Sequence, residues 1–189
     1  MKKVQLYSGG LDSYIISKIW KPDVKLYFNY GTEQNKQEMA HLPSDVIIKD
    51  LPIAEYMQND GMSTIPLRNL IFAALAVNYG DEILIGGLAS DFHYDKTEEF
   101  VIKMTELFNS VLTKEIQPKR IKIVVPFKKY TKTEMVYNFL KDGGTIAELD
   151  ANSFSCYTPV GDKPCGKCGA CRARKKAYKE AEDLIREEE

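Results

Sequence analysis

Four cysteines near the C-terminus are close enough in sequence to bind one metal ion. Two Cys-x-x-Cys steps share Cys168, and a fourth cysteine precedes them at position 156. Four thiolates satisfy a tetrahedral zinc ion and leave no open coordination position, which is typical of a structural site. The sequence therefore predicts a zinc-binding loop at residues 153–175, with the ligands Cys156, Cys165, Cys168 and Cys171.

Two other states of these cysteines remain open. The run Cys-x-x-Cys-x-x-Cys is also a ligand pattern of iron–sulfur clusters, and two disulfides would use all four thiols. The sequence starts with Met1-Lys2-Lys3-Val4 rather than an apolar signal segment. It also has no apolar run near the ~20 residues of a membrane span. We therefore expect a cytoplasmic protein, in which a reducing environment favours a metal over disulfides.

A second motif, Ser8-Gly9-Gly10-Leu11-Asp12-Ser13, lies between an apolar run and a helical pattern. The two glycines allow a sharp turn and the close approach of an anion. Free amides at the start of a helix bind phosphate oxygens, and the hydroxyls of Ser8 and Ser13 can add hydrogen bonds. Asp12 suits a role in binding Mg²⁺ or in bracing the loop. The alternative is an ordinary strand-to-helix turn, because the GxxxxGK[ST] and GxGxxG motifs are absent.

The six-residue loop resembles the phosphate-binding loop of the ATP pyrophosphatases, which holds ATP while AMP is transferred to an acceptor. With the cysteine loop included, most of the chain resembles the 7-cyano-7-deazaguanine synthase family of the queuosine pathway. The cysteine loop is the most discriminating segment, since few other ATP pyrophosphatases carry it. The matching segments outside the phosphate loop are Arg68-Asn69, Ile85 to Phe92, Lys132-Thr133-Glu134, Ser155-Cys156-Tyr157, Cys165 to Cys171 and Arg174-Lys175.

This resemblance implies an ATP-dependent enzyme that forms a carbon–nitrogen bond. Members of the family adenylate 7-carboxy-7-deazaguanine, let ammonia displace AMP to give an amide, and activate that amide again for dehydration to the nitrile. The resemblance implies ATP, Mg²⁺ and Zn²⁺ as cofactors and these small molecules as substrates. We further expect a homodimer that binds neither membranes nor nucleic acid.

The same resemblance assigns roles to individual residues. The predicted catalytic residues are Asp12 and Lys132. Lys132 would approach the phosphates, and its place in a first helical turn requires a compensating anion. Residues 8–13, Arg68 and Asn69 are expected to bind the nucleotide. The predicted substrate contacts are Asp91, Phe92, Tyr94, Asp95, Arg174 and Lys175.

Two segments depart from the family pattern. The run from Thr32 to Glu38 lacks the histidine expected there, and the substrate loop is shortened to Tyr94-Asp95-Lys96-Thr97 without an arginine. Loss of one positioning or proton-transfer group can lower a rate by roughly a hundredfold or more. A divergent paralogue that stops at the amide, or passes the acyl group to another amine, is therefore the alternative to a full synthase.

Strands and helices alternate along most of the chain. Short apolar runs predict strands at residues 4–7, 25–30, 46–48, 83–85 and 121–125, and helical periodicity predicts helices between them, including 98–115. This order is typical of a doubly wound parallel α/β sheet, in which ligands bind beyond the C-terminal ends of the strands. The resemblance specifies the Rossmann-like sheet of the adenine nucleotide alpha hydrolases. We expect one domain over residues 1–189, with a closing helix after the cysteines.

The composition favours an enzyme over a nucleic-acid-binding module. The 189 residues are 44% hydrophobic and 28% charged, with a net charge of −1, which is ordinary for a globular protein. A zinc-knuckle module that binds RNA or a protein, with a relic nucleotide site, would present a broad basic face with interleaved aromatic residues. The basic run at residues 163–179 is short and is followed by acidic residues, which weighs against that module.

Overall fold

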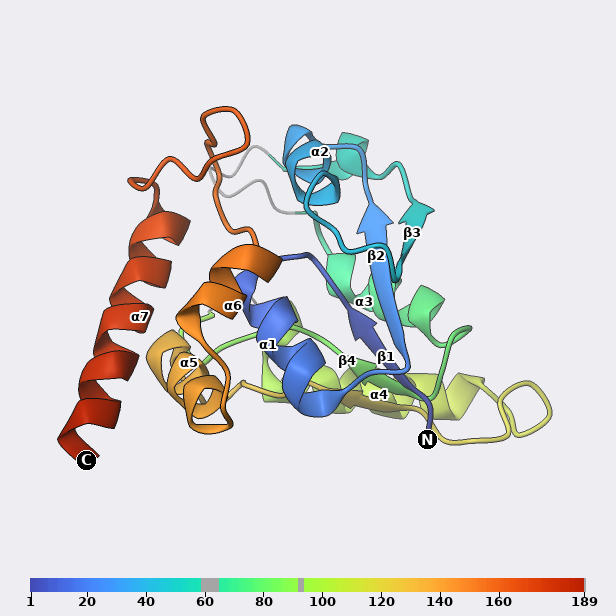
Figure 1. The fold of residues 1–189 in the computed structure, drawn as a ribbon. Coiled ribbons are helices and arrows are strands. Elements are labelled where there is room, and N and C mark those ends of the chain that lie inside the picture. Colours follow the sequence, from blue (N-terminus) through green and yellow to red (C-terminus); the bar gives the residue numbers. More distant parts are fainter. Residues whose placement is uncertain (59–64, 92–93, 189) are drawn as a thin grey trace.

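In the computed structural model, which describes residues 1–58, 65–91 and 94–188, five strands form one parallel sheet (Figure 1). β1 (Lys3–Leu6) pairs with β2 (Val24–Asn29) on one side and with β4 (Glu82–Leu84) on the other. β3 (Val46–Asp50) and β5 (Lys122–Val124) form the two edges, in the order β3-β2-β1-β4-β5. The predicted parallel α/β sheet is confirmed.

Helices cover both faces of this sheet. On one face, aromatic residues of two helices, including Phe72 and Phe100, pack against Val4 and Ile83 of the strands. On the other face, Ile15, Met135 and Leu149 belong to a second core. The first face carries α3 (Arg68–Ala76) and α4 (Glu98–Val111), and the second carries α1 (Leu11–Trp20), α5 (Lys132–Lys141), α6 (Ile146–Asn152) and α7 (Gly169–Glu188).

The C-terminal ends of the strands lie at one end of the molecule, together with α2 (Glu33–Met39) and the loop that follows α6 (Figure 1). α2 follows β2 there, and the loop connects α6 to α7. Two short 3₁₀ helices, η1 (Ala54–Tyr56) and η2 (Tyr94–Lys96), lie in other connections. The sheet therefore brings the phosphate loop and the cysteine loop to one end, although they are far apart in sequence.

The alternation of side chains along β1 positions the phosphate loop. Val4 and Leu6 face the core that contains α3 and α4. Gln5 is fully buried, and its Nε2 donates to the carbonyl of Ser13, 2.7 Å away, in the first turn of α1. This bond connects β1, which precedes the phosphate loop, to α1, which follows it. The loop therefore lies at the C-terminal edge of the sheet, as predicted.

Two helices differ from the sequence-based prediction. α4 ends at Val111 rather than at residue 115, and the Asn109 side chain near its end exchanges two hydrogen bonds with the backbone of Ile121, at 2.8 and 2.9 Å. α6 was not predicted, because it has only seven residues and a single buried one, Leu149, which is too short for a periodic pattern. Among the described residues, no helix is both long and apolar enough to cross a membrane.

Candidate active site and metal centre

The phosphate loop has the backbone geometry that its glycines allow. Gly9 has a φ of +74°, and a Cβ atom there would lie 3.2 Å from Cδ2 of Leu42, so a side chain would be strained and crowded. The hydroxyls of Ser8 and Ser13 lie 3.0 Å apart, and Ser13 Oγ also accepts from the amide of Ser8. The two serines thus close the loop across its base.

The start of α1 offers donors to a ligand. The N-cap residue Gly10 provides no side-chain cap, and within residues 1–58, 65–91 and 94–188 no acceptor is seen for the amides of Asp12 and Ser13. Unpaired amides at a helix N-terminus, together with the helix dipole, attract anions. The loop therefore offers free donors from which an anionic group can accept hydrogen bonds, and phosphate binding by residues 8–13 stays a prediction.

Asp12 and Lys132, the two predicted catalytic residues, are brought together by α1 and α5. Lys132 Nζ lies 2.5 Å from Asp12 Oδ1, and both side chains are 30% exposed. Lys132 is the first residue of α5, which begins with a capping box between Thr131 and Glu134. A cation at this place is unfavourable against the helix dipole. Asp12 supplies the anion that the placement of Lys132 was predicted to require.

Arg68 and Asn69 lie at the start of α3 and contact two different neighbours. The Arg68 guanidinium stacks over the ring of Tyr30 at 5.5 Å, and Nη1 donates to the Tyr30 hydroxyl at 3.5 Å. Asn69 is buried and donates to the carbonyl of Asp95 at 3.4 Å. The predicted nucleotide-binding pair thus joins the end of β2 to the predicted substrate loop.

The run that lacks the family histidine is organised around Asn35. This buried side chain accepts from the amides of Tyr30 and Thr32, and it donates to the Tyr27 hydroxyl at 2.5 Å. Tyr27 in turn donates to Glu38 Oε2 at 2.8 Å. Burial raises the pKa of Glu38 above its usual value, although the hydrogen bond from Tyr27 and the charge of Arg68 partly offset this. The run thus holds a partly buried carboxylate at the site's edge. Glu38 is one of the residues that, together with Glu33 and Asp95, we expected could replace the missing groups, and this role stays a prediction.

The predicted substrate loop is braced from within. Asp91 Oδ2 accepts from the amide of Leu88 at 2.9 Å and lies 3.3 Å from Lys96 Nζ. Tyr94 is exposed and makes an edge contact with Phe100. These contacts show how the loop is held, and substrate contact by Asp91, Tyr94 and Asp95 stays a prediction. Phe92, the remaining predicted residue of this loop, lies outside the described residues.

The four cysteines come together into one cluster, as predicted. All four are free thiols, and their sulfur atoms lie within 4.8 Å of one another. The amide of Cys165 donates to Cys156 Sγ at 3.2 Å, and the amide of Cys168 donates to Cys165 Sγ at 3.3 Å. Amides that donate to sulfur stabilise thiolates, which are the form that binds metal. The cluster can hold a metal ion.

The four thiols differ in electrostatic environment. Hydrogen bonds from the Thr158 hydroxyl and from the backbone of Lys167 and Cys168 lower the pKa of Cys165 to about 5. Burial raises the pKa of Cys171 to about 12. A metal ion would have to displace the proton of Cys171, so metal binding at this cluster is expected to release protons.

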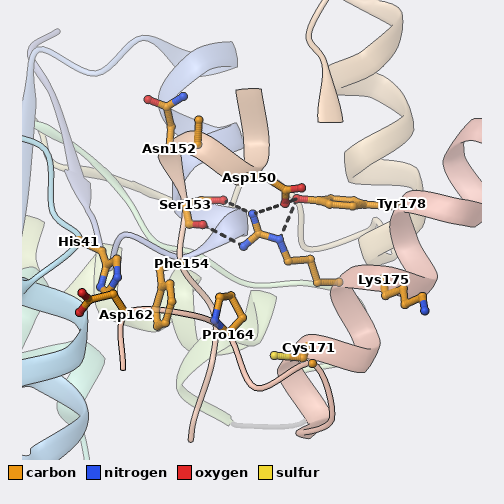
Figure 2. A pocket seen from close by; sticks show the side chains of 13 residues that line it. His41, Asp150, Asn152, Ser153, Phe154, Asp162, Pro164, Cys171, Lys175 and Tyr178 are labelled. Atoms are coloured by element: carbon orange, nitrogen blue, oxygen red, sulfur yellow. Dashed lines mark hydrogen bonds and ion pairs between the residues drawn. The ribbon is translucent and has the colours of Figure 1, made fainter. Parts of the chain in front are cut away.

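Arg174 and Lys175 follow the cysteines on α7, beside a cavity of about 670 Å³ (Figure 2). Arg174 donates to the carbonyls of Leu149 and Ser153 at 2.7 and 3.0 Å, and its Nε donates to the Tyr178 hydroxyl at 2.8 Å. The guanidinium therefore ties α7 to the end of α6. Direct substrate contact would require it to give up these bonds. Lys175 is exposed, and its side chain points away from Asp150 and Ser153 (Figure 2).

Comparisons with known proteins identify relatives over nearly the whole chain. The family model "Queuosine biosynthesis protein QueC" matches residues 43–182. The 7-cyano-7-deazaguanine synthase of Methanobrevibacter smithii is 30% identical, and the match covers 96% of this chain and 94% of that protein. The synthase of Trichodesmium erythraeum is 31% identical, with 95% of this chain and 76% of that protein covered.

A solved structure is similar at a greater distance. It is the U34-tRNA thiolase NcsA from Methanococcus maripaludis with its [4Fe-4S] cluster, and it matches 98% of this chain and 67% of its own. The sequence identity is 14% and the TM-score is 0.44. This similarity is too distant for the neighbour's cluster to indicate which metal the four cysteines could hold.

Proposed function

The chain belongs to the queuosine biosynthesis protein QueC family, and from this premise we propose that it is an ATP-dependent 7-cyano-7-deazaguanine synthase. Its substrates would be 7-carboxy-7-deazaguanine, ammonia and ATP. The observation that carries the proposal is the Asp12–Lys132 pair, 2.5 Å apart at an anion-binding loop. This is a charge arrangement suited to a nucleotide whose phosphates must be held while one of them is attacked.

The reaction requires two activations of the same substrate. In the first, a carboxylate oxygen attacks the α-phosphorus of ATP and pyrophosphate leaves. Ammonia then displaces AMP and yields the amide. In the second, the amide oxygen attacks the α-phosphorus of a second ATP and pyrophosphate leaves. The nitrogen then gives up both of its protons as AMP departs, and the nitrile forms. Each step replaces a poor leaving group, an oxide, by AMP.

The described residues can support this chemistry through charge and orientation. The amides at the start of α1 would hold phosphate oxygens, and Lys132 would turn from Asp12 to the charge that develops on pyrophosphate. Asp12 would then be free to hold Mg²⁺, which neutralises phosphate charge. Arg68 and Asn69, placed where α3 meets the end of β2, are proposed to contact the nucleotide. Asp91, Tyr94, Asp95 and Lys175 are proposed to face the substrate.

We propose zinc as the metal of the cysteine cluster. Zinc–sulfur bonds of about 2.3 Å place the sulfurs of a tetrahedral site about 3.8 Å apart, which fits four sulfurs within 4.8 Å. An iron–sulfur cluster places iron and sulfide between its thiolates and needs a wider spacing. Four thiolates leave zinc no open position, so the ion would stabilise the loop and take no part in the reaction.

One observation keeps the second candidate, a paralogue that stops at the amide, under test. In the run that lacks the family histidine, the Asn35 side chain binds two backbone amides and Tyr27. That side chain is occupied and offers no proton for the second activation.

The proposed homodimer would bury some of the apolar residues that α4 exposes, such as Ile102 and Val111. We expect it in the cytoplasm, with no nucleic-acid partner.

The deciding experiment is a reaction with purified protein, ATP, Mg²⁺, ammonia and 7-carboxy-7-deazaguanine, followed by mass spectrometry. A synthase gives AMP, pyrophosphate and the nitrile, with two ATP consumed per product. Accumulation of the amide indicates the paralogue. Release of ADP, or no nucleotide turnover with any acceptor, overturns the assignment of the phosphate loop.

A further inference from the structure

Residues 153–156 connect α6 to the cysteine cluster, and we call this segment the strut. The strut begins at Ser153, whose carbonyl and hydroxyl accept from Arg174 at 3.0 and 2.9 Å. It ends at Cys156, whose sulfur is buried in the cysteine cluster. Both ends of the strut are therefore fixed, one by α7 and the other by the metal site.

The middle of the strut is bound to the phosphate loop. The amide of Phe154 donates to the carbonyl of Gly9 at 2.9 Å. The Phe154 ring stacks on His41, with centroids 3.8 Å apart and planes 8° from parallel (Figure 2). The amide of Leu11, the first residue of α1, donates to Ser155 Oγ at 3.0 Å. The strut thus touches the loop on both sides of Gly10.

The Ser155 hydroxyl lies at the mouth of the loop. A Cβ atom at Gly10 would lie 3.4 Å from Ser155 Oγ and 3.4 Å from Ser8 Oγ, so the two hydroxyls flank Gly10. Ser155 Oγ is an acceptor for Leu11, and a hydroxyl that accepts still has its own proton to donate. In the part of the chain that the structure describes, no acceptor is recorded for this proton. A phosphate oxygen at the start of α1 would be such an acceptor.

We propose that Ser155 is a phosphate-binding residue of the nucleotide site, contributed by the cysteine loop 144 residues away from Leu11. The proposal rests on the proposed function, in which residues 8–13 hold the phosphates of ATP. The Ser155 hydroxyl accepts from the Leu11 amide and donates its own proton to a phosphate oxygen. The loop thereby gains one more hydrogen-bond donor. Because Cys156 follows directly, the metal fixes the position of this donor, and ATP affinity depends on the metal.

The hydrogen bond between the Leu11 amide and Ser155 could also block the loop, and this alternative predicts the opposite change in ATP affinity. If the hydroxyl merely occupies the Leu11 amide and must leave before ATP binds, its removal frees a donor and tightens ATP binding. If Ser155 binds phosphate, its removal weakens ATP binding. Hydrogen bonds to charged groups contribute enough that a loss of about tenfold or more in affinity is expected.

The test measures the affinity of the metal-loaded protein for ATP with Mg²⁺ by titration calorimetry. Ser155→Ala should bind ATP about tenfold or more weakly. Ser153→Ala is the matched control, because it loosens the same strut without removing a contact to the loop, and its affinity should stay within about twofold of wild type. Equal or tighter binding by Ser155→Ala, or equal losses in both variants, overturns the proposal. A wild-type protein that binds no ATP instead overturns the proposed function.

Two further measurements separate a direct role from a loosened cysteine loop. Zinc content and Tm are determined for the same samples, and Ser155→Thr, which keeps the hydroxyl, is titrated in parallel. Recovery of affinity by threonine supports a role of the hydroxyl, and weak binding by both variants overturns it. Removal of zinc should weaken ATP binding by the wild type but add little to the loss in Ser155→Ala. If zinc removal weakened ATP binding by the same factor in Ser155→Ala as in the wild type, the metal would not act through Ser155.

Discussion

Lys132 and Arg174 both carry a positive charge at the end of the sheet where the two loops meet, but their surroundings differ. Lys132 meets Asp12 across the phosphate loop, and each side chain is 30% exposed. The Arg174 side chain is 14% exposed and donates to two backbone carbonyls, two hydroxyls and Asp150. Lys132 is held by a single, partly exposed carboxylate, whereas Arg174 is held by five acceptor atoms, of which only the Asp150 carboxylate belongs to a largely exposed side chain.

This difference determines which cation a ligand can engage. A partly exposed ion pair contributes little net stability, because water screens its charges, so a phosphate can replace Asp12 as the partner of Lys132. Withdrawal of Arg174 would leave the carbonyl of Ser153 without its donor, and the carbonyl of Leu149 would keep only the Ser153 hydroxyl. The loss of these bonds is unfavourable for buried groups. The comparison supports the proposal that Lys132 acts on the nucleotide, whereas Arg174 ties α7 to the end of α6.

The largest expected effect is on turnover after the change Lys132→Ala. Loss of the cation that stabilises charge on pyrophosphate should lower kcat by about a hundredfold or more. The Tm should change little, since the pair that is lost is partly exposed. The measurements are AMP formation and thermal unfolding.

Lys141→Ala is the matched control for Lys132→Ala, because Lys141 lies on the same helix and pairs with Glu188 far from the loop. Its kcat should equal that of the wild type. If Lys132→Ala retained full turnover, the ion pair would be structural and the two cations would no longer differ in role.

The next effect concerns the metal proposed for the cysteine cluster. Elemental analysis should give about one zinc per chain. Removal of the zinc should lower the Tm by several degrees, since about 1 kcal/mol corresponds to 2–4 °C in a chain of this size. The sulfurs of Cys165 and Cys168 are the more exposed ones, so a chelator should reach the ion from their side.

The chelated protein also tests the identity of the metal. Re-addition of Zn²⁺ should restore the Tm, and this provides the control for damage by the chelator. A brown protein with visible absorbance and iron in place of zinc would contradict the zinc assignment and would indicate an iron–sulfur cluster.

Regular patterns were sufficient to predict the sheet, the edge that carries the site and the cysteine cluster. Val4–Tyr7 and Ile83–Ile85 are apolar enough to indicate buried strands, and the cysteines carry their ligand spacing in one segment. The contacts of Arg174 could not be predicted, because they depend on α6, which is too short to show periodicity. Ser155 was missed as a neighbour of Leu11 for a related reason: hydrogen bonds between distant segments leave no local pattern.

The third effect is on stability after the change Arg174→Ala. Several acceptors lose their donor, so the free energy of unfolding should fall by about 3 kcal/mol. The kcat of the folded enzyme should stay close to that of the wild type. Urea unfolding and initial rates below the transition measure the two quantities.

Arg172→Ala is a suitable control for Arg174→Ala, because Arg172 is exposed and donates to the carbonyl of Lys167. It should leave stability nearly unchanged. A large loss of kcat in Arg174→Ala with little change in stability would restore Arg174 to the substrate site and would break the comparison.

The smallest effect concerns Glu38. Its side chain is partly buried, and the charge of Arg68 acts on it only from a distance. Burial raises its pKa above 4.5 despite Tyr27 and Arg68, so the folded protein holds this proton more tightly than the unfolded chain does. The resulting stabilisation is complete below the unfolded pKa and is lost as the pH rises through the folded pKa. At neutral pH the buried carboxylate is therefore destabilising.

Glu38→Gln removes this charge while keeping an oxygen that can accept from the Tyr27 hydroxyl. The variant should be slightly more stable than the wild type at pH 7, and the difference should shrink as the pH falls toward 4.5, as measured by urea unfolding across that range. Glu134 is the control of opposite sign, because the amide of Thr131 lowers its pKa, so Glu134→Gln should destabilise at pH 7. If Glu38→Gln were less stable at pH 7, the attraction of Arg68 would outweigh burial. Glu38 and Arg68 would then form an ion pair at the site, as Asp12 and Lys132 do.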